Sequence, residues 1–426
     1  MPPGAGLPQS VSASVGGLSF EDILAARRRI AGGVFETPCR ESVALSEICG
    51  ARIFCKLEYQ QRTGSFKERG ARNALLQLGA ESKRRGVIAA SAGNHALALA
   101  WHGRDLGIPV SVVMPQFAPL IKQERCKALG ARVLNHGSNI AEAKVRADEL
   151  VTAESLTYIH GFNDPAIIAG QGTAALEIVE QVPECEAVVV PVGGGGLIAG
   201  MGLALKRLRP QVSLIGVEPE RCASYRAALI AGRPVRVESL PTLADGLAVP
   251  EVGELAFVLA RETVDEVIAV DEESISLAML RLVESEKGVV EGAGAAPLAA
   301  FLAGHLAHLR GKTVVLALGG GNVDPLVLSR VIEHGLAVDG RLVQFTAVIW
   351  DRPGGLAELA STLATAGASV QDVVHERAFG GPDVSRVQVE CKIEVRGRAH
   401  AEEVFKALRA RGIDVLPRPL NSKPPV

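Results

Sequence analysis

The sequence predicts an α/β protein with two doubly wound lobes, followed by a smaller C-terminal domain of ferredoxin-like α+β type. Short apolar runs alternate with stretches of helical periodicity through the first three quarters of the chain, which indicates parallel sheets covered by helices. Beyond Leu336 the order changes to strand, helix, strand, strand, helix, strand. With 426 residues, of which 48% are apolar and 22% charged, the chain is long enough for two or three domains with sizeable cores.

The first doubly wound lobe is predicted from three short apolar runs. The runs at 87–90, 110–114 and 133–134 have the length and composition of strands, and a helix is expected from about Ala96. Such an alternation is typical of a parallel sheet. We expect residues 86–160 to form a small mobile lobe.

The second lobe repeats this pattern further along the chain. Strands are predicted at 188–190, 214–217 and 313–318, with helical segments between them. Two doubly wound lobes in one chain are expected to meet at a cleft, where ligands bind beyond the carboxyl ends of the strands. We expect a large lobe formed by residues 20–85 and 161–335.

The C-terminal domain shows both periodicities clearly. Apolar residues at i, i+3, i+4 and i+7 from Leu356 predict an amphipathic helix, whereas residues 387–395 alternate strictly between apolar and polar, as in a half-exposed strand. We expect this domain to span 342–418. Its other elements are predicted at 343–350, 368–374 and 413–415, with a second helix around Phe405.

Charge and cysteine content exclude several classes of partner. Lysine and arginine total 45 against 47 acidic residues, for a net charge of −2, so no basic excess attracts nucleic acid or a membrane, and a small-molecule partner is favoured. Residues 1–19 contain no apolar stretch long enough for a signal or membrane helix, and we expect a flexible tail. The seven cysteines lack zinc-like spacing and indicate reduced thiols in a cytoplasmic protein without a metal site.

A lysine and a glycine run indicate the chemistry. Lys67 lies in the segment 65–70, and an apolar run at 187–190 precedes a glycine loop. The glycines of this loop are Gly193, Gly194, Gly195 and Gly196. Glycine N–H groups at a helix start can approach a phosphate closely, and a lysine that forms Schiff bases needs a cofactor held by such a handle. Pyridoxal phosphate is the cofactor that requires both.

Each feature also has a simpler explanation. The glycine run could be a hinge, and Lys67 a solvated lysine in a turn. Two other phosphate motifs fail on spacing. Residues 197–199 lack the glycines of a dinucleotide fingerprint, and Leu306 stands where the nucleotide loop ending at 311–313 requires a glycine.

A polar loop after the predicted strand 87–90 is a candidate substrate site. Its residues are Ser91, Ala92, Gly93, Asn94 and His95. The Asn94 side chain could hydrogen-bond a ring oxygen of the cofactor, and the backbone N–H groups could hold a substrate carboxylate. Alternatively, Gly93 and Asn94 form an ordinary turn, and His95 is only a structural hydrogen-bond donor.

Taken together, these segments resemble the fold-type II pyridoxal-phosphate enzymes, specifically the threonine dehydratases (threonine ammonia-lyases), which are relatives of serine racemase. The resemblance extends from about residue 20 to 335. It rests on several segments in the same order: 65–70, 91–95, 169–173, 192–196, 242–246, 291–294 and 320–322.

The resemblance implies a tryptophan synthase β-like fold and a role for each site residue. Lys67 would form the Schiff base with the cofactor, Phe66 would pack on the pyridine ring, and Asn94 would bind the ring oxygen. The glycines at 193–196 would hold the phosphate, and Gly319 would lie beside the ring nitrogen. Residues 343–417 resemble a single ACT domain, which implies either an amino-acid effector such as isoleucine or valine, or subunit contacts in a homodimer or homotetramer.

Of the positions that depart from the pattern of the relatives, three bear on the choice of reaction or on a metal site, while Leu97 and Ala98 replace a Gln-Gly pair found in many relatives. Gly319 replaces the usual Ser or Cys, so its side chain cannot bond the ring nitrogen. Ala92 stands where serine racemases carry a second serine, and alanine cannot move a proton. Ser224 stands where the racemase metal site has an aspartate beside Glu218, so we expect no tight divalent-metal site.

These departures favour dehydration over racemisation. The expected reaction is deamination of L-threonine to 2-oxobutanoate and ammonia, with L-serine giving pyruvate. The alternatives are a dehydratase of another β-hydroxy amino acid such as 3-hydroxyaspartate, a serine racemase-like enzyme, and a non-catalytic amino-acid sensor.

Overall fold

The computed structural model describes residues 17–376 and 385–418. It divides into two compact units, with the boundary between Val323 and Asp324. The sequence prediction extended the large lobe to residue 335, a position inside helix α14 (Pro325–Val338), whereas the whole of this helix belongs to the second unit. Most of the predicted flexible tail lies outside the described residues. Of its last residues, Leu18 is buried and Ser19 caps the first helix through a hydrogen bond with Asp22.

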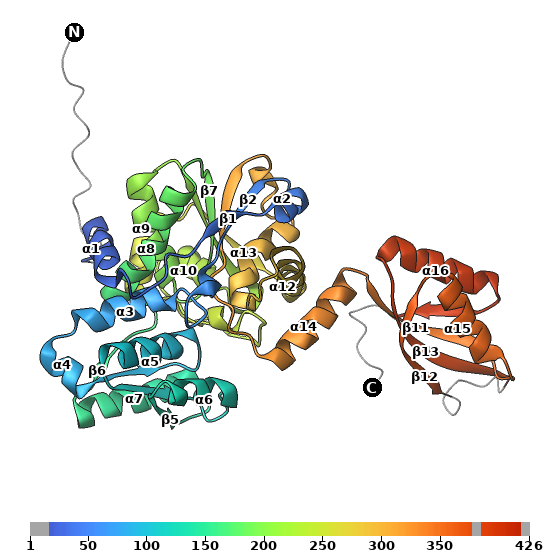
Figure 1. Ribbon diagram of the computed structural model, residues 1–426, viewed down its shortest axis with the longest axis horizontal. Coiled ribbons are helices and arrows are strands. Elements are labelled where there is room, and N and C mark those ends of the chain that lie inside the picture. The colour runs from blue at the N-terminus through green and yellow to red at the C-terminus, as the bar shows by residue number, and fades with distance from the viewer. Residues whose placement is uncertain (1–16, 377–384, 419–426) are drawn as a thin grey trace, which may run out of the picture. The chain divides into compact units, whose positions relative to one another are not determined.

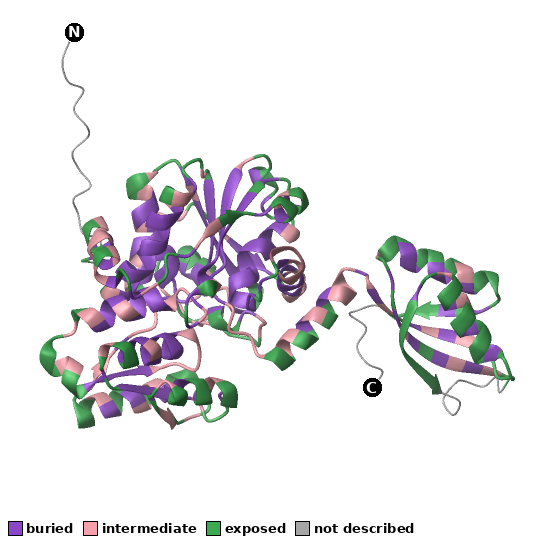
Figure 2. Ribbon diagram, viewed as in Figure 1, coloured by how far each residue is buried: buried purple, intermediate pink, exposed green. Residues whose placement is uncertain are grey.

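The larger sheet of the first unit has six strands in the order β1-β2-β10-β7-β8-β9 (Figure 1). All neighbours are parallel except β1 and β2. The strands are β1 (Cys39–Glu41), β2 (Arg52–Lys56), β7 (Ala187–Pro191), β8 (Ser213–Pro219), β9 (Glu266–Val270) and β10 (Thr313–Ala317). The central strands are buried throughout, as expected where helices cover both faces (Figure 2).

Helices surround this sheet. They are α1 (Phe20–Ile30), α2 (Val43–Cys49), α3 (Lys67–Gln77), α8 (Pro165–Gln181), α9 (Gly196–Leu208), α10 (Ser224–Ala231), α11 (Glu254–Ala260), α12 (Glu272–Glu286) and α13 (Gly292–Leu302). Helix α8 packs closely on α9 because Gly172 and Gly200 face each other, and a Cβ on Gly172 would lie 2.7 Å from the carbonyl oxygen of Gly200.

The smaller sheet is entirely parallel, in the order β5-β4-β3-β6. Its strands are β3 (Val87–Ala90), β4 (Val110–Met114), β5 (Arg132–Asn135) and β6 (Thr157–Tyr158), with helices α4 (Ala80–Arg85), α5 (Asn94–Leu106), α6 (Leu120–Ala128) and α7 (Ile140–Glu154). Helix α3 packs against both α5 and α8, so it joins the small lobe to the large one. The predicted pair of doubly wound lobes is confirmed.

A buried group of charges holds α3 in place. The Arg69 guanidinium forms ion pairs with Glu58 and Glu177, at 2.6 and 2.5 Å, and Lys56 pairs with Glu177 at 2.5 Å. All four side chains are buried, so each charge depends on its partners rather than on water. This network fixes the helix on which Lys67 is the first residue.

The second unit has the predicted ferredoxin-like topology. Its antiparallel sheet has the order β12-β13-β11-β14 and is covered by two helices whose apolar residues form one core. The elements are α14, β11 (Leu342–Trp350), α15 (Gly355–Thr365), β12 (Ser369–Glu376), β13 (Arg386–Glu394), α16 (Arg398–Ala410) and β14 (Asp414–Pro417). The predicted fold class is therefore confirmed for this unit too.

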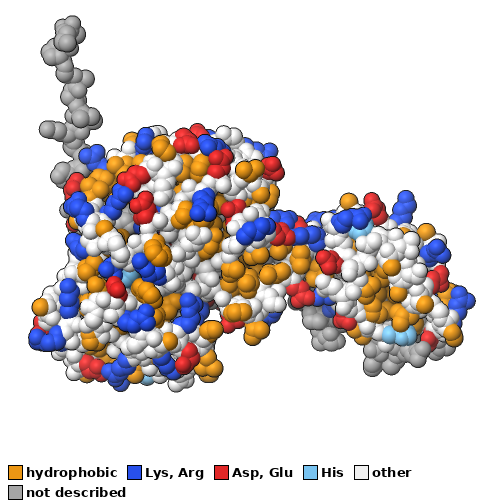
Figure 3. Space-filling view, in the orientation of Figure 1, with side chains coloured by type: hydrophobic (Ala, Val, Ile, Leu, Met, Phe, Trp, Pro, Cys, Tyr) orange, Lys and Arg blue, Asp and Glu red, His pale blue; other side chains and the backbone are white. Residues whose placement is uncertain are grey.

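The distribution of charged side chains and the state of the cysteines agree with the near-neutral net charge and with the reduced thiols expected from the sequence. Basic and acidic side chains are interspersed on the face of the first unit seen in Figure 3. All seven cysteines are free thiols. Within the described ranges, no helix combines the length and the apolar character that crossing a bilayer requires.

Candidate functional site

A cavity of about 980 Å³ in the first unit brings the predicted site residues together. It lies beyond the carboxyl ends of β3, β7 and β10, where ligands bind in doubly wound sheets. Every predicted catalytic, cofactor and substrate residue lines it: Phe66, Lys67, Ser91, Ala92, Gly93, Asn94, His95, Gly193, Gly194, Gly195, Gly196 and Gly319.

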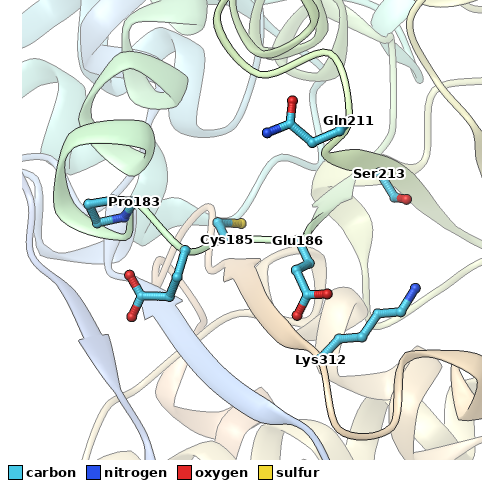
Figure 4. A pocket seen from close by; sticks show the side chains of 7 residues that line it. Pro183, Cys185, Glu186, Gln211, Ser213 and Lys312 are labelled. Carbon is cyan, nitrogen blue, oxygen red and sulfur yellow. The ribbon is translucent and has the colours of Figure 1, made fainter.

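A smaller cavity of about 330 Å³ lies at the opposite, amino-terminal end of the large sheet (Figure 4). Glu186 and Lys312 immediately precede β7 and β10, and Ser213 begins β8. The Glu186 carboxylate already accepts a hydrogen bond from the Thr313 backbone, and burial raises the pKa of the Cys185 thiol to about 12. This cavity therefore offers no activated nucleophile.

Lys67 is the first residue of α3 and is half-buried, rather than a solvated lysine in a turn. Its Nζ donates a hydrogen bond to the carbonyl oxygen of Gly161 at 2.7 Å. Burial lowers the pKa of Lys67 to about 8, although the nearby Glu291 carboxylate acts in the opposite direction. A larger neutral fraction makes the amine a better nucleophile and base near neutral pH.

The glycine loop connects β7 to the start of α9. Gly195 adopts a left-handed conformation with φ of +87° and caps the helix. A Cβ on Gly194 would lie 2.3 Å from the Phe162 ring, and one on Gly196 would lie 2.6 Å from the Phe162 carbonyl oxygen. The loop therefore needs glycine for packing against Phe162 as well as for its backbone conformation.

The same loop fits a phosphate group. In the part of the chain that the structure describes, the N–H groups of residues 193–196 donate to no protein acceptor, although Gly194, Gly195 and Gly196 are buried. Buried backbone donors without partners are rare in folded proteins. Several of them at the positive end of a thirteen-residue helix form a ready site for an anion.

Asn94 begins α5 and belongs to a chain of side-chain hydrogen bonds. Its Nδ2 donates to Oε1 of Glu291 at 2.7 Å, and its Oδ1 accepts from Nδ2 of Asn322 at 2.8 Å. Burial is the main cause that raises the pKa of Glu291 to about 7, and the negative charge of Asp245 adds to it. Glu291 therefore holds a proton over a wider pH range than an exposed carboxyl group.

The remainder of the polar loop is partly structural. The Ser91 hydroxyl accepts a hydrogen bond from the Gly93 backbone at 3.3 Å. Nε2 of His95 lies 3.1 Å from the Ile159 carbonyl oxygen, so this nitrogen carries the proton. Burial lowers the pKa of His95 to about 3 and keeps the ring neutral. This geometry supports the structural explanation for His95.

Gly319 follows β10 and lies against Phe66. A Cβ at Gly319 would approach the Phe66 ring at 3.3 Å and Pro191 at 3.5 Å, so a small side chain fits here with little adjustment.

Elsewhere in the large lobe, the Glu218 carboxylate accepts hydrogen bonds from the backbone of Tyr225 and Arg226 at the start of α10. Among the described residues, no group of three or more His, Cys, Asp or Glu is arranged to hold a metal ion.

Four residues of the site were not assigned a role from the sequence. His160, Gly161 and Phe162 form a loop that contacts Lys67 and the glycine loop, and nothing in their composition distinguishes them from an ordinary turn. Glu291 lies in the segment 291–294, which resembles a segment of the threonine dehydratases but does not by itself indicate a role for the carboxylate. The signal missed for Glu291 was an acidic residue directly before an apolar helix, α13.

Comparison with known proteins agrees with this geometry. Residues 30–320 match the model of the pyridoxal-phosphate dependent enzyme family, and the chain belongs to that family. Pyridoxal phosphate is therefore its cofactor, as predicted from Lys67 and the glycine loop, and the residues present fit it.

More particular similarities extend over nearly the whole chain. An L-threonine ammonia-lyase of Thermotoga maritima is 44% identical over 93% of this chain and 99% of its own length. Another from Geobacter sulfurreducens is 40% identical over 94% of this chain and its entire length.

Solved structures cover roughly the first three quarters of the chain. The processed form of threonine deaminase isoform 2 from Solanum lycopersicum is 36% identical with a TM-score of 0.70, over 77% of this chain and 99% of that protein. The serine racemase of Dictyostelium discoideum is 35% identical with a TM-score of 0.68, over 72% of this chain and 99% of that protein. The chain is thus similar both to a threonine deaminase and to a serine racemase of one fold.

Proposed function

We propose that this chain is an L-threonine ammonia-lyase that converts L-threonine to 2-oxobutanoate and ammonia, and L-serine to pyruvate. The observation that carries the proposal is one cavity containing both the amine of half-buried Lys67, whose pKa is lowered to about 8, and the N–H groups of residues 193–196, which have no acceptor among the described residues. The near full-length similarity to two proteins named L-threonine ammonia-lyase supports this choice of substrate.

The cofactor supplies an aldehyde that attaches the amino acid and a ring that accepts its electrons. The N–H groups of residues 193–196 would hold its phosphate, Phe66 would lie against its ring, and Asn94 would bind its ring oxygen. The backbone N–H groups of residues 91–95 would hold the substrate carboxylate, since they lie at the start of α5.

Lys67 would remove the proton from the substrate Cα once its amine is free. The β-hydroxyl group would leave as water by taking up one proton, which balances the proton that Lys67 removes from Cα, and the resulting enamine is released, tautomerises and is hydrolysed by water. One molecule of water leaves and one is consumed, so the net products are 2-oxobutanoate and ammonia. The buried position of Lys67 supports this role because its pKa of about 8 leaves a substantial neutral fraction of the amine near that pH.

The cavity favours elimination over racemisation. Apart from the catalytic lysine, three cationic side chains among the described residues line it. Lys122 pairs with Asp245 at 3.1 Å and Lys144 with Asp148 at 2.5 Å, whereas Arg236 is the cation that could meet the second carboxylate of 3-hydroxyaspartate, so that substrate is compared directly with threonine in the assay below. A racemase needs a proton donor opposite Lys67, and Ala92 offers none. The intact amine and anion site argue against a non-catalytic sensor.

The second unit would provide regulation. We propose that its ferredoxin-like fold is an ACT domain that binds an amino-acid effector, and that the enzyme is a cytoplasmic homodimer or homotetramer. The supporting observation is the two-layer α+β topology together with its separate core.

The proposal is tested with purified protein saturated with pyridoxal phosphate. Ammonia and 2-oxo acid release are followed with L-threonine, L-serine and 3-hydroxyaspartate, and the products from serine are checked for D-serine. We expect kcat/KM to be highest for L-threonine, and Lys67→Ala to abolish turnover and the visible cofactor band, while the exposed Lys127→Ala has no effect. Ligand binding without ammonia release would instead establish the sensor.

A further inference from the structure

The side-chain amide of Asn322 connects three segments around the cavity. Its Nδ2 donates to the Thr63 carbonyl oxygen at 2.6 Å and to Oδ1 of Asn94 at 2.8 Å. Its Oδ1 accepts from Nη1 of Arg125 at 3.0 Å. Thr63 lies in the loop before Lys67, Asn94 begins α5, and Arg125 lies on α6, so one amide joins both lobes.

The partners of Asn322 determine which way its amide points. Arginine can only donate and a backbone carbonyl can only accept, so Oδ1 of Asn322 must face Arg125 and its Nδ2 must face Thr63. The same Nδ2 then donates to Asn94, and the Asn94 oxygen must face Asn322.

This arrangement also fixes the amide of Asn94. Its Oδ1 is engaged by Asn322 and one Nδ2 hydrogen by Glu291, which leaves the second Nδ2 hydrogen for a ligand in the cavity. Asn94 therefore presents a donor, not an acceptor. A donor is what a negatively charged phenolic oxygen of the cofactor requires.

Close packing keeps Asn322 in this position. Gly64 has a φ of +81°, and a Cβ there would lie 2.8 Å from Oδ1 of Asn322. The backbone of Gly321 donates to the Gly64 carbonyl oxygen at 2.9 Å, which holds the two loops together.

We propose that Asn322 is a positioning residue that holds Asn94 as a hydrogen-bond donor toward the cofactor, and that its bond to Arg125 couples this orientation to the placement of the small lobe. The inference deepens the proposed function and rests on it for the activity measurements. Its spectroscopic measurement depends only on cofactor binding.

The variants are chosen to separate orientation from packing. Asn322→Asp keeps the oxygen that faces Arg125 but loses both donors, so a carboxylate oxygen faces Asn94 and its amide must rotate. Asn322→Ala removes the contact altogether. Arg125→Ala removes only the exposed small-lobe partner, and Lys127→Ala on the same helix is the matched control.

For each holoenzyme we would record the visible cofactor band, the Kd for pyridoxal phosphate, kcat and KM for L-threonine, and the thermal midpoint. Asn322→Asp is expected to shift the band and lower kcat on the order of tenfold or more, since hydrogen bonds to a charged group are affected. Arg125→Ala should shift the band in the same direction by less and raise KM, while its thermal midpoint matches that of Lys127→Ala.

An unchanged band and unchanged kinetics in Asn322→Asp and Asn322→Ala would overturn the inference. If the Asn322 variants fail to fold, Arg125→Ala decides, because its side chain is exposed; a band and KM identical to those of Lys127→Ala would refute the coupling. A wild-type protein that shows the band but does not deaminate L-threonine would refute the proposed function alone, and the band comparison would still test Asn322.

Discussion

At the scale of single residues, the burial of Lys67 has a kinetic consequence. Because burial lowers the pKa of its amine to about 8, only a minority of the amine is protonated above that pH, whereas an exposed lysine stays charged to about 10.4. The rate at which cofactor-free protein forms its visible band with pyridoxal phosphate should therefore rise roughly tenfold per pH unit below pH 8 and level off above it. Stopped-flow absorbance measures this rate. A plateau reached only near pH 10 would contradict the burial of the amine.

The raised pKa of Glu291 makes a prediction about stability. The folded protein holds a proton on Glu291 up to about pH 7, but the unfolded chain releases it near the ordinary value of 4.5, so this group contributes less to stability as pH rises between those values. Glu291→Gln keeps the acceptor for Asn94 without the charge. Its free energy of unfolding should be close to that of wild type near pH 4.5 and exceed it at pH 8 by about 3 kcal/mol, since the pKa is raised from 4.5 to about 7. Urea unfolding of the cofactor-free protein at both pH values measures the difference, and equal values at pH 8 would count against it.

Two glycines in the cavity should respond oppositely to substitution. Gly319→Ser adds a hydroxyl where a Cβ has contacts of 3.3 Å or more, so folding and cofactor binding should persist and the visible band should shift as the ring nitrogen gains a partner. Gly194→Ala places a methyl group 2.3 Å from Phe162 and should displace the loop, which weakens cofactor binding by an order of magnitude or more. Fluorescence titration with pyridoxal phosphate compares the two. Similar affinities would show that Phe162 moves aside at little cost.

At the scale of elements, α3 depends on the charges buried beneath it. Arg69→Ala leaves Glu58 and Glu177 without their main partner and should lower the free energy of unfolding by about 3 to 5 kcal/mol. Arg27→Ala removes an ion pair with Glu180 that is largely exposed, and a much smaller loss is expected. Denaturant unfolding with both variants checks this. If both variants lose a similar free energy of unfolding, water must reach Glu58 and Glu177 and solvate their charges once the Arg69 side chain is gone.

The bounds of individual strands and helices show which local sequence patterns predict secondary structure reliably. The runs 87–90 and 110–114 were predicted with the bounds of β3 and β4, because short apolar segments between turns are typical of buried strands. Strand β6 has only two residues, Thr157 and Tyr158, and no periodicity can be detected over that length. The start of α5 lies two residues before the predicted one, since its first residue, Asn94, is held by distant partners rather than by local preference.

At the scale of the whole molecule, the two compact units should be separable. Residues 324–426 contain their own apolar core and are expected to fold as an isolated fragment with a cooperative thermal transition. Residues 1–323 contain the complete cavity and should retain the cofactor and ammonia release, but lose any response to isoleucine or valine. Assays with and without these amino acids test the proposal. A response that persists in the 1–323 fragment would place the effector site in the first unit.

The cavity also shows where prediction from sequence ends. Lys67, Asn94 and the glycine loop could be predicted as site residues because each has a local signature next to a predicted element, and the structure places all of them at one cavity. Asn322 and Glu291 act through Asn94, about two hundred residues away along the chain, so their contacts exist only after the two lobes have folded together. His160 and Phe162 likewise contribute through proximity to the glycine loop, which no spacing rule anticipates.

The four charges buried around α3 also affect how the protein responds to heat. The hydration of ions becomes less favourable as temperature rises, because ordering water around a charge carries a negative entropy. The cost of withdrawing Lys56, Glu58, Arg69 and Glu177 from water therefore decreases on warming, whereas the gain from apolar contacts levels off. Relative to helices held by apolar contacts alone, the helix that carries Lys67 should be held more firmly in warm solution than in cold.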